Sequence, residues 1–207
     1  AKFALGLFEK PVPDLVSEIE NTTEHRISAL HAAREGIVML KNDGTLPLKR
    51  VRKIFVVGPN ADSQTILGDW AAPRPAEDVI TMLKGIRARF PSALIDTMCF
   101  GGKILDIRPS DFAKAQAKAA AADITIAVMG ENSQRYSAYG ITCGENNDRD
   151  NIDLPGMQGQ LLEAICKAGK PVVLSLLAGR ANNLVWASEN VNAILEAWEP
   201  GMMGGQS

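Results

Sequence analysis

The sequence predicts an α/β fold, a three-layer sandwich in which a mostly parallel sheet has helices on both faces. Two observations predict it. Short apolar runs alternate with longer amphipathic segments along most of the chain, and the short runs are apolar throughout. A strand that is buried on both faces has this pattern, and parallel sheets covered by helices bury their strands in this way.

The first expected element is a helix that begins near Asn21-Thr22-Thr23, whose side-chain oxygens can cap a helix N-terminus. Apolar residues then recur at helical spacing as far as Leu40. Asn42-Asp43-Gly44 is typical of a helix end. We therefore expect one helix up to about Leu40.

The later elements are expected in alternation. The apolar runs expected as strands are 54–57, 93–98, 124–129, 172–177 and 191–197. The amphipathic segments expected as helices are 79–89, 110–121 and 155–167.

Two ranges complete the expected organisation. Residues 1–21 contain Gly6, Pro11 and Pro13 without clear periodicity, so we expect a connecting arm there. Residues 22–207 are expected to form the α/β domain. Because the last residues, MMGGQS, come where a further helix is expected to begin, we expect this domain to be truncated at its C-terminus.

Composition narrows the classes of function. The 207 residues carry 22 basic and 24 acidic side chains, a net charge of −2, which predicts no nucleic-acid or membrane partner. No run approaches the ~20 apolar residues that span a bilayer. Three cysteines and two histidines offer little material for a disulfide framework, a zinc site or a Ser-His-Asp triad. We expect neither a metal ion nor a cofactor.

Three expected strands run directly into glycine, at Gly58, Gly130 and Gly179. Loops at the carboxyl ends of parallel strands build the ligand crevice of open α/β sheets. The connection from Gly130 to Asp153 is much longer than the ~2–6 residues usual between a strand and a helix, and such loops are commonly functional. We therefore expect the functional site first in this loop, and also in GPNAD (58–62) and around Gly179-Arg180.

The Gly130–Asp153 loop concentrates carboxylates, arginines and aromatic rings: Glu131, Arg135, Tyr136, Tyr139, Glu145, Asp148, Arg149, Asp150 and Asp153. Sugar hydroxyls need paired hydrogen-bond donors and acceptors, and sugar faces stack on rings. Carboxyl groups also perform general acid/base catalysis. The composition therefore fits a sugar-processing site, although a solvated polar loop has the same composition.

Other enzyme classes lack their defining motifs. The turn after the expected strand 54–57 reads GPNADS rather than G-x-G-x-x-G, the motif of a dinucleotide site. Neither a Walker sequence nor the G-x-S-x-G elbow of α/β-hydrolases occurs. Cys143 could be a nucleophile, but no histidine nearby in the sequence could activate its thiol.

Six segments in order resemble landmarks of one known domain. They are EGIVMLKNDGTLPLK (35–49), VVGPNAD (56–62), LGDW (67–70), GEN…CGENNDR…LPGMQ (130–158), GKPVVLSLLAGR (169–180) and AILEAWEPGMMGGQS (193–207). Together they resemble the second, C-terminal α/β-sandwich domain of family 3 glycoside hydrolases. The opening AKFALGLFEKPVPD resembles the segment that links this domain to the family's TIM barrel.

The resemblance implies a retaining, exo-acting β-glucosidase or β-xylosidase whose site lies between two domains. An N-terminal TIM barrel of the same polypeptide would supply an aspartate nucleophile, and this domain would supply a glutamate as general acid/base. Within CGENNDR, Glu145 occupies that position, and Glu131 is the competing candidate. The resemblance also implies a glycoside or oligosaccharide substrate and a periplasmic or secreted location.

Further residues take expected roles from the same resemblance. Trp70, in LGDW, resembles the aromatic wall that some members present to the leaving-group sugar. Glu131 is also a candidate for substrate binding, although its place at the end of a strand favours a structural hydrogen-bonding role. Asp148 and Arg149 are expected to hold the loop by an internal pair or to contact the barrel. The alternative to catalysis is a non-catalytic module that binds sugar or supports a barrel.

Overall fold

A computed structural model of the chain describes residues 1–12, 21–136 and 140–207. Part of the expected arm and Tyr139 lie outside the described residues. Helix α1 spans Thr23–Gly36 and is capped by the Thr22 side-chain oxygen, which accepts a hydrogen bond from the His25 N–H.

The expectation of one helix as far as Leu40 is wrong. Helix α1 ends at Gly36, and Val38–Asn42 forms strand β1, which pairs antiparallel with strand β6 (Ala193–Glu196). The apolar residues at 37–40 fit a helical and an extended period equally well. Pairing with strand β6 favours the extended conformation. Glycine also has a poor helix propensity, which favours an end at Gly36.

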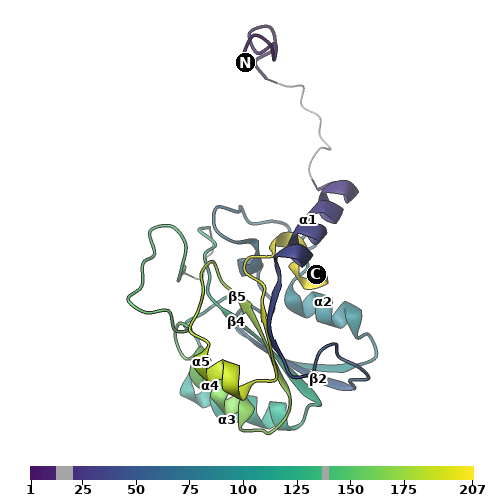
Figure 1. Ribbon diagram of the computed structural model, residues 1–207, viewed down its shortest axis with the longest axis vertical. Helices are drawn as coiled ribbons and strands as arrows, with labels where there is room; N and C mark the ends of the chain where they lie inside the picture. Colours follow the sequence, from purple (N-terminus) through teal and green to yellow (C-terminus); the bar gives the residue numbers. More distant parts are fainter. Residues whose placement is uncertain (13–20, 137–139) are drawn as a thin grey trace.

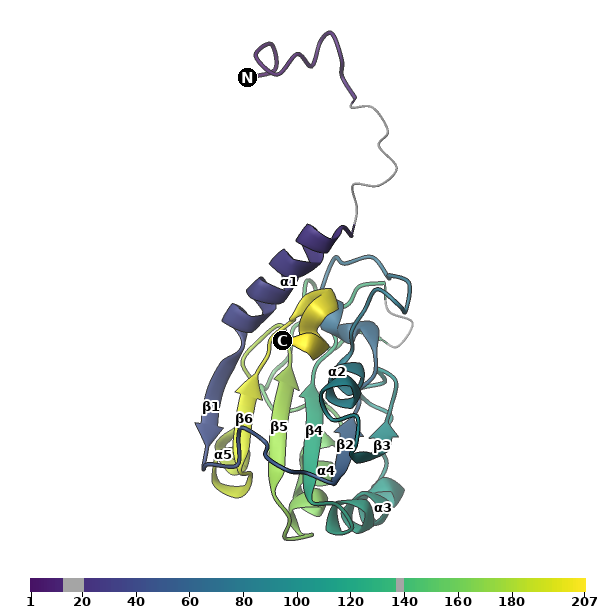
Figure 2. The ribbon, with the colours of Figure 1, turned by 90° about the vertical axis from the view of Figure 1, so that its right-hand side faces the viewer.

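The sheet has six strands in the order β1-β6-β5-β4-β2-β3, and Figure 2 shows them side by side. The remaining strands are β2 (Lys53–Gly58), β3 (Leu94–Cys99), β4 (Ile124–Gly130) and β5 (Val172–Leu177). Every neighbouring pair is parallel except β1 with β6. This confirms the predicted mostly parallel sheet.

Helices cover both faces of the sheet. Figure 1 shows α3 (Pro109–Ala120), α4 (Gln158–Cys166) and α5 (Val185–Asn190) together on one side. On the other side lie α1, α2 (Met82–Arg89) and the short 3₁₀ helices η1 (Gln64–Leu67) and η2 (Gly201–Gln206). The three-layer sandwich is therefore confirmed.

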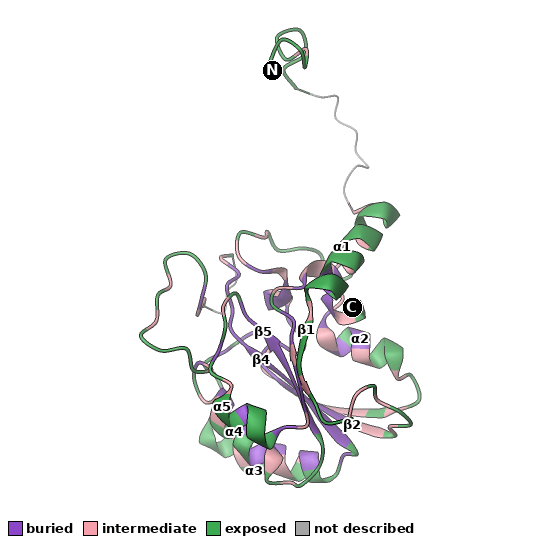
Figure 3. Cartoon of the chain, in the orientation of Figure 1, coloured by how far each residue is buried: buried purple, intermediate pink, exposed green. Residues whose placement is uncertain are grey.

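Two apolar cores lie against the two faces of the sheet. Along β2, Phe55 and Val57 pack with α3, α4 and α5, while Ile54 and Val56 pack into the core that includes Leu83 of α2. Successive side chains of a strand point to opposite faces, so a strand between two helical layers must be apolar at every position. Figure 3 shows β4 and β5 buried and much of the helix surface exposed.

The carboxyl edge of the sheet is built around glycines. Gly58 and Gly130 end β2 and β4 at φ values of +128° and +131°, and a Cβ on either would lie 2.0 Å from a carbonyl oxygen of the adjacent strand. The strand order reverses between β2 and β4, because the chain visits β3 on one side of β2 and then β4 on the other. Such a reversal is where ligands bind in open α/β sheets.

The segments that follow β2, β4 and β5 are tied together at this edge. The Asn60 side-chain amide, buried just after β2, donates to the main-chain carbonyls of Glu131 (3.1 Å) and Leu177 (3.3 Å). The site expected from the strand-end glycines is therefore one contiguous region. Among the described residues, no helix has the length and apolar character that a membrane span requires.

Candidate functional site

Glu145 lies at the surface of the Gly130–Asp153 loop, and 54% of its side chain is exposed. Its Oε2 atom accepts hydrogen bonds from Trp70 Nε1 (2.8 Å) and from Arg135 Nη2 (3.1 Å). The Arg135 guanidinium in turn stacks on the Trp70 ring, 4.2 Å from its centroid. The fold thus joins the expected acid/base residue and the expected aromatic wall, which are 75 residues apart in sequence.

Asp69 fixes this cluster from behind. Its Oδ2 atom accepts a hydrogen bond from the Glu145 main-chain N–H (3.0 Å), and its Oδ1 atom accepts one from the Trp70 N–H (2.8 Å). Its carboxylate also forms an ion pair with Arg135. The main-chain N–H of Glu145 is the largest cause that lowers the pKa of Asp69, and Arg135 adds to it. Asp69 is therefore suited to holding the loop as an anion and not to donating a proton.

Gly144 permits this close approach. Its φ is +92°, and a Cβ there would lie 2.8 Å from Asp69 Oδ2. A residue with a side chain at this position would be strained and would push the loop away from Asp69. The backbone conformation at position 144 and the closeness of Asp69 therefore explain why a glycine precedes the candidate acid.

Trp70 has an exposed ring suited to stacking on a sugar face. The residue is 62% exposed and adopts a left-handed backbone conformation, with φ of +58°. The indole of tryptophan combines a large apolar face with an N–H that needs a partner, and here that partner is the Glu145 carboxylate. Contact of Trp70 with substrate stays a prediction.

Glu131 sits in a different environment from Glu145. Its side chain has no exposed surface, and its Oε1 atom contacts Arg149 Nη1 (3.3 Å), Arg180 Nε (3.5 Å) and Asn182 Nδ2 (3.1 Å). Arg149 therefore pairs within the domain. The burial of Glu131 favours a structural role over contact with a sugar, and its expected substrate binding stays a prediction.

The cysteines are poor nucleophiles in this fold. Burial raises the pKa of Cys143 to about 11, and it raises those of Cys99 and Cys166 to about 11 as well. Their thiols are therefore protonated at neutral pH. Within the described ranges, no three histidine, cysteine, aspartate or glutamate side chains gather as metal ligands would.

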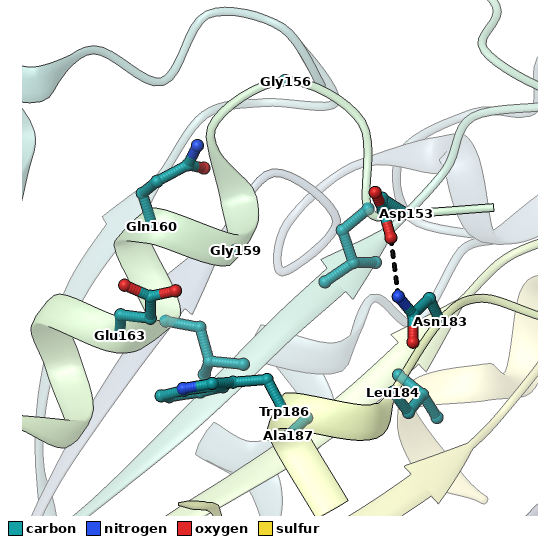
Figure 4. A pocket seen from close by; sticks show the side chains of 11 residues that line it. Asp153, Gly156, Gly159, Gln160, Glu163, Asn183, Leu184, Trp186 and Ala187 are labelled. Atoms are coloured by element: carbon teal, nitrogen blue, oxygen red, sulfur yellow. Dashed lines mark hydrogen bonds between the residues drawn. The ribbon is translucent and has the colours of Figure 1, made fainter. Parts of the chain in front are cut away.

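A surface groove of about 330 Å³ lies between α4 and α5. Figure 4 shows the Trp186 ring beside Glu163 at one end and the hydrogen bond from Asn183 Nδ2 to Asp153 (2.8 Å) at the other. None of the residues that line the groove belongs to the Glu145 cluster. The candidate acid is therefore not part of this groove.

Sequence reasoning found some of these residues and missed others. Asp69 lies in the LGDW segment, but the sequence analysis did not predict that it holds Glu145. The signal that could have indicated this role is its position directly before Trp70, the expected aromatic wall. Arg180 follows a strand-end glycine and was in a region expected to be functional, whereas Asn182 carried no such signal.

The fold and the site define a mostly parallel α/β sandwich domain that holds an exposed carboxylate beside a tryptophan. The comparisons with known proteins agree with that class. The model of the family described as "Glycosyl hydrolase family 3 C-terminal domain" matches residues 37–207, and the chain belongs to this family.

Similar proteins cover the chain almost completely. It is 34% identical to a β-xylosidase of Formosa agariphila, over 100% of this chain and 29% of the relative. It is 32% identical to a periplasmic β-glucosidase of Salmonella typhimurium, over 100% of this chain and 30% of the relative. The chain therefore spans less than a third of the length of these relatives.

A solved structure gives the same result for the fold. The crystal structure of a β-glucosidase from Listeria innocua in complex with gluconolactone superposes with a TM-score of 0.86 at 31% identity. The match covers 99% of this chain and 27% of that chain. The resemblance expected from the six sequence segments is confirmed.

Proposed function

We propose that this domain supplies Glu145 as the general acid/base of a retaining, exo-acting β-glycosidase that hydrolyses terminal β-linked glucosyl or xylosyl groups. The observation that carries the proposal is the position of the Glu145 carboxylate, exposed at the carboxyl edge of the sheet beside Trp70. The names of the relatives, β-xylosidase and β-glucosidase, support the substrate class.

In the first step, protonated Glu145 donates its proton to the glycosidic oxygen as the bond from that oxygen to the anomeric carbon breaks. A second carboxylate bonds to the anomeric carbon and forms the glycosyl-enzyme. In the second step, Glu145 takes a proton from water, whose oxygen bonds to the anomeric carbon and releases the second carboxylate. The same group thus acts first as an acid and then as a base.

The second carboxylate is proposed to come from an N-terminal TIM barrel of the same polypeptide. The relatives are more than three times as long as the matched region, which leaves room for such a domain. A retaining mechanism needs the two carboxyl groups about 5–5.5 Å apart, and both Asp69 oxygens are already held by Glu145, Trp70 and Arg135. We therefore expect the 207-residue chain alone to release no aglycone from aryl β-glycosides.

The periplasmic relative supports a periplasmic or secreted location for the parent enzyme. A fractionation of the producing cells, with immunodetection of the parent protein, measures this directly.

The test of the acid/base role is Glu145→Ala in the parent enzyme, with paired substrates that differ only in the leaving group. Substrates with poor leaving groups should lose about 10²–10⁴-fold in kcat/KM, the usual contribution of a general acid. Activated aryl glycosides should lose far less, because their leaving groups need no proton. Glu189→Ala is the matched control, since Glu189 is exposed on α5.

An equal loss for both kinds of substrate would contradict the acid role and would favour a module that binds sugar or supports the barrel. Full activity of the isolated 207-residue chain would contradict the proposed second domain.

A further inference from the structure

Glu131 brings a buried negative charge to the end of β4. Its contacts to Arg149, Arg180 and Asn182 all converge on one oxygen, Oε1. The other oxygen, Oε2, is buried and has no hydrogen-bond partner in the part of the chain that the structure describes. A buried charge is stable only when it is paired. The two guanidinium groups therefore provide the compensation.

The groups that hold Glu131 also hold the loop that carries Glu145. Arg180 Nη2 donates to the main-chain oxygen of Asn147 (2.8 Å), and the Asn147 side chain donates to the main-chain oxygen of Glu145 (2.9 Å). Arg149, itself in the loop, also donates to Asn151 Oδ1 (3.0 Å). The carboxylate is thus connected to Glu145 through three consecutive contacts, with Arg180 and Asn147 as the two residues between them.

The sheet edge is fixed by other groups. The Glu131 main-chain N–H donates to Leu177 O (2.8 Å), and its main-chain oxygen accepts from Asn60 Nδ2 (3.1 Å). These bonds do not involve the carboxylate. In the described chain, the carboxylate contacts the acid/base loop and the segment after β5.

We propose that Glu131 is a positioning residue: through Arg180 and Arg149, its buried carboxylate sets the place of the Glu145 loop. The inference rests on the proposed acid/base role of Glu145 and extends it to a second glutamate. Loss of the Glu131 charge leaves the two arginines, both more exposed than the carboxylate, without their shared anionic partner. The contacts that this loss weakens hold the loop around Glu145, because other bonds hold the sheet edge.

The test is Glu131→Gln in the parent enzyme, a change that keeps the side-chain size and one oxygen acceptor. A displacement of about 1 Å at a catalytic group can lower the rate by about 10²-fold. We therefore expect kcat/KM for poor leaving groups to fall about 10–10²-fold, with activated aryl glycosides much less affected. Glu189→Gln, the same chemical change at an exposed position of α5, should change neither.

A double-mutant cycle separates positioning from general stability. If Glu131 acts through Glu145, the pair Glu131→Gln and Glu145→Ala should be no slower on poor leaving groups than Glu145→Ala alone, because coupled residues are not additive. If the two losses multiply, or if Glu131→Gln slows both kinds of substrate equally, the positioning role is overturned. Unchanged kinetics in Glu131→Gln would overturn it as well.

Arg180→Gln tests the same connection at the more exposed partner of Glu131. Its result does not depend on how well Glu131→Gln folds. It removes the contacts to both Glu131 and Asn147. The same selective loss on poor leaving groups is expected, and its absence would count against the proposal.

Failure of the acid/base role gives a different result. If Glu145→Ala shows no selective loss on poor leaving groups, while Glu131→Ala shows that loss and is rescued by azide, then Glu131 is itself the acid. That result overturns both proposals. If Glu145→Ala behaves as expected but its loss and that of Glu131→Gln multiply in the double variant, the positioning proposal fails and the acid/base proposal stands.

Discussion

Replacement of Gly130 by alanine tests how the sheet edge supports the site. Gly130 directly precedes Glu131, and its φ of +131° is a conformation that residues with a Cβ rarely adopt. An added Cβ would lie 2.0 Å from Leu177 O. That carbonyl accepts hydrogen bonds from the Glu131 N–H (2.8 Å) and from Asn60 Nδ2 (3.3 Å). The methyl group would therefore displace the carbonyl that joins β4, β5 and the segment after β2.

The expected cost combines three effects. A residue with a Cβ in this backbone region costs about 1–3 kcal/mol, overpacking adds about 1–3 kcal/mol, and each weakened hydrogen bond adds about 1 kcal/mol. With two hydrogen bonds weakened, the total is about 4–8 kcal/mol, a large part of the roughly 5–15 kcal/mol by which domains are stable. For a domain of this size the midpoint should fall by about 10 °C or more.

Urea and thermal unfolding of the 207-residue chain, followed by circular dichroism, measure the change. Gly159→Ala is the matched control, because Gly159 lies in α4 and a Cβ there meets no atom within 4 Å. It should be neutral or should stabilise by up to about 1 kcal/mol. If Gly130→Ala unfolded within about 1 kcal/mol of the control, the argument for an obligatory glycine edge would be refuted.

Two further predictions concern single side chains. Trp70→Phe keeps a ring but removes the indole N–H bonded to Glu145. The kcat/KM of the parent enzyme should therefore fall about tenfold, the value of one hydrogen bond to a charged group. Unchanged kinetics would show that Trp70 is not part of the site. Burial of Glu196 raises its pKa to about 7 from 4.5. The folded state therefore keeps a proton that the unfolded state loses, and stability should decline as pH rises from 4.5 to 7, by on the order of 3 kcal/mol. Glu196→Gln should remove that decline in urea titrations across this pH range, and a decline of the same size in the variant would assign it to another group.

The parallel sheet could be predicted because its strands are apolar at every position, as Phe55 and Val56 on opposite faces illustrate. Strand β1 could not, because residues 37–40 fit a helical spacing and only pairing with β6 selects the extended form. Helix α5 was missed because its six residues are too few to display a period.

For the site, the sequence indicated which residues carry the chemistry but not how they are held. Glu145 and Trp70 were named from motifs, and the long loop after Gly130 was found from its length. These two residues are 75 positions apart in the sequence, so only the fold brings them into contact. Asp69 stands directly before Trp70, but its hydrogen bond with the Glu145 N–H depends on the fold, and no local pattern indicates the contact of Asn182 with Glu131.

The most direct test of the central claim uses the Glu145→Ala parent enzyme with an activated aryl glycoside and added azide. Without the general base the glycosyl-enzyme should accumulate, because water is no longer activated. Azide needs no base and can enter the space left by the side chain, so turnover should recover. Proton NMR should then show a glycosyl azide of retained β configuration. If azide neither restores turnover nor yields this product, Glu145 is not the acid/base of the enzyme.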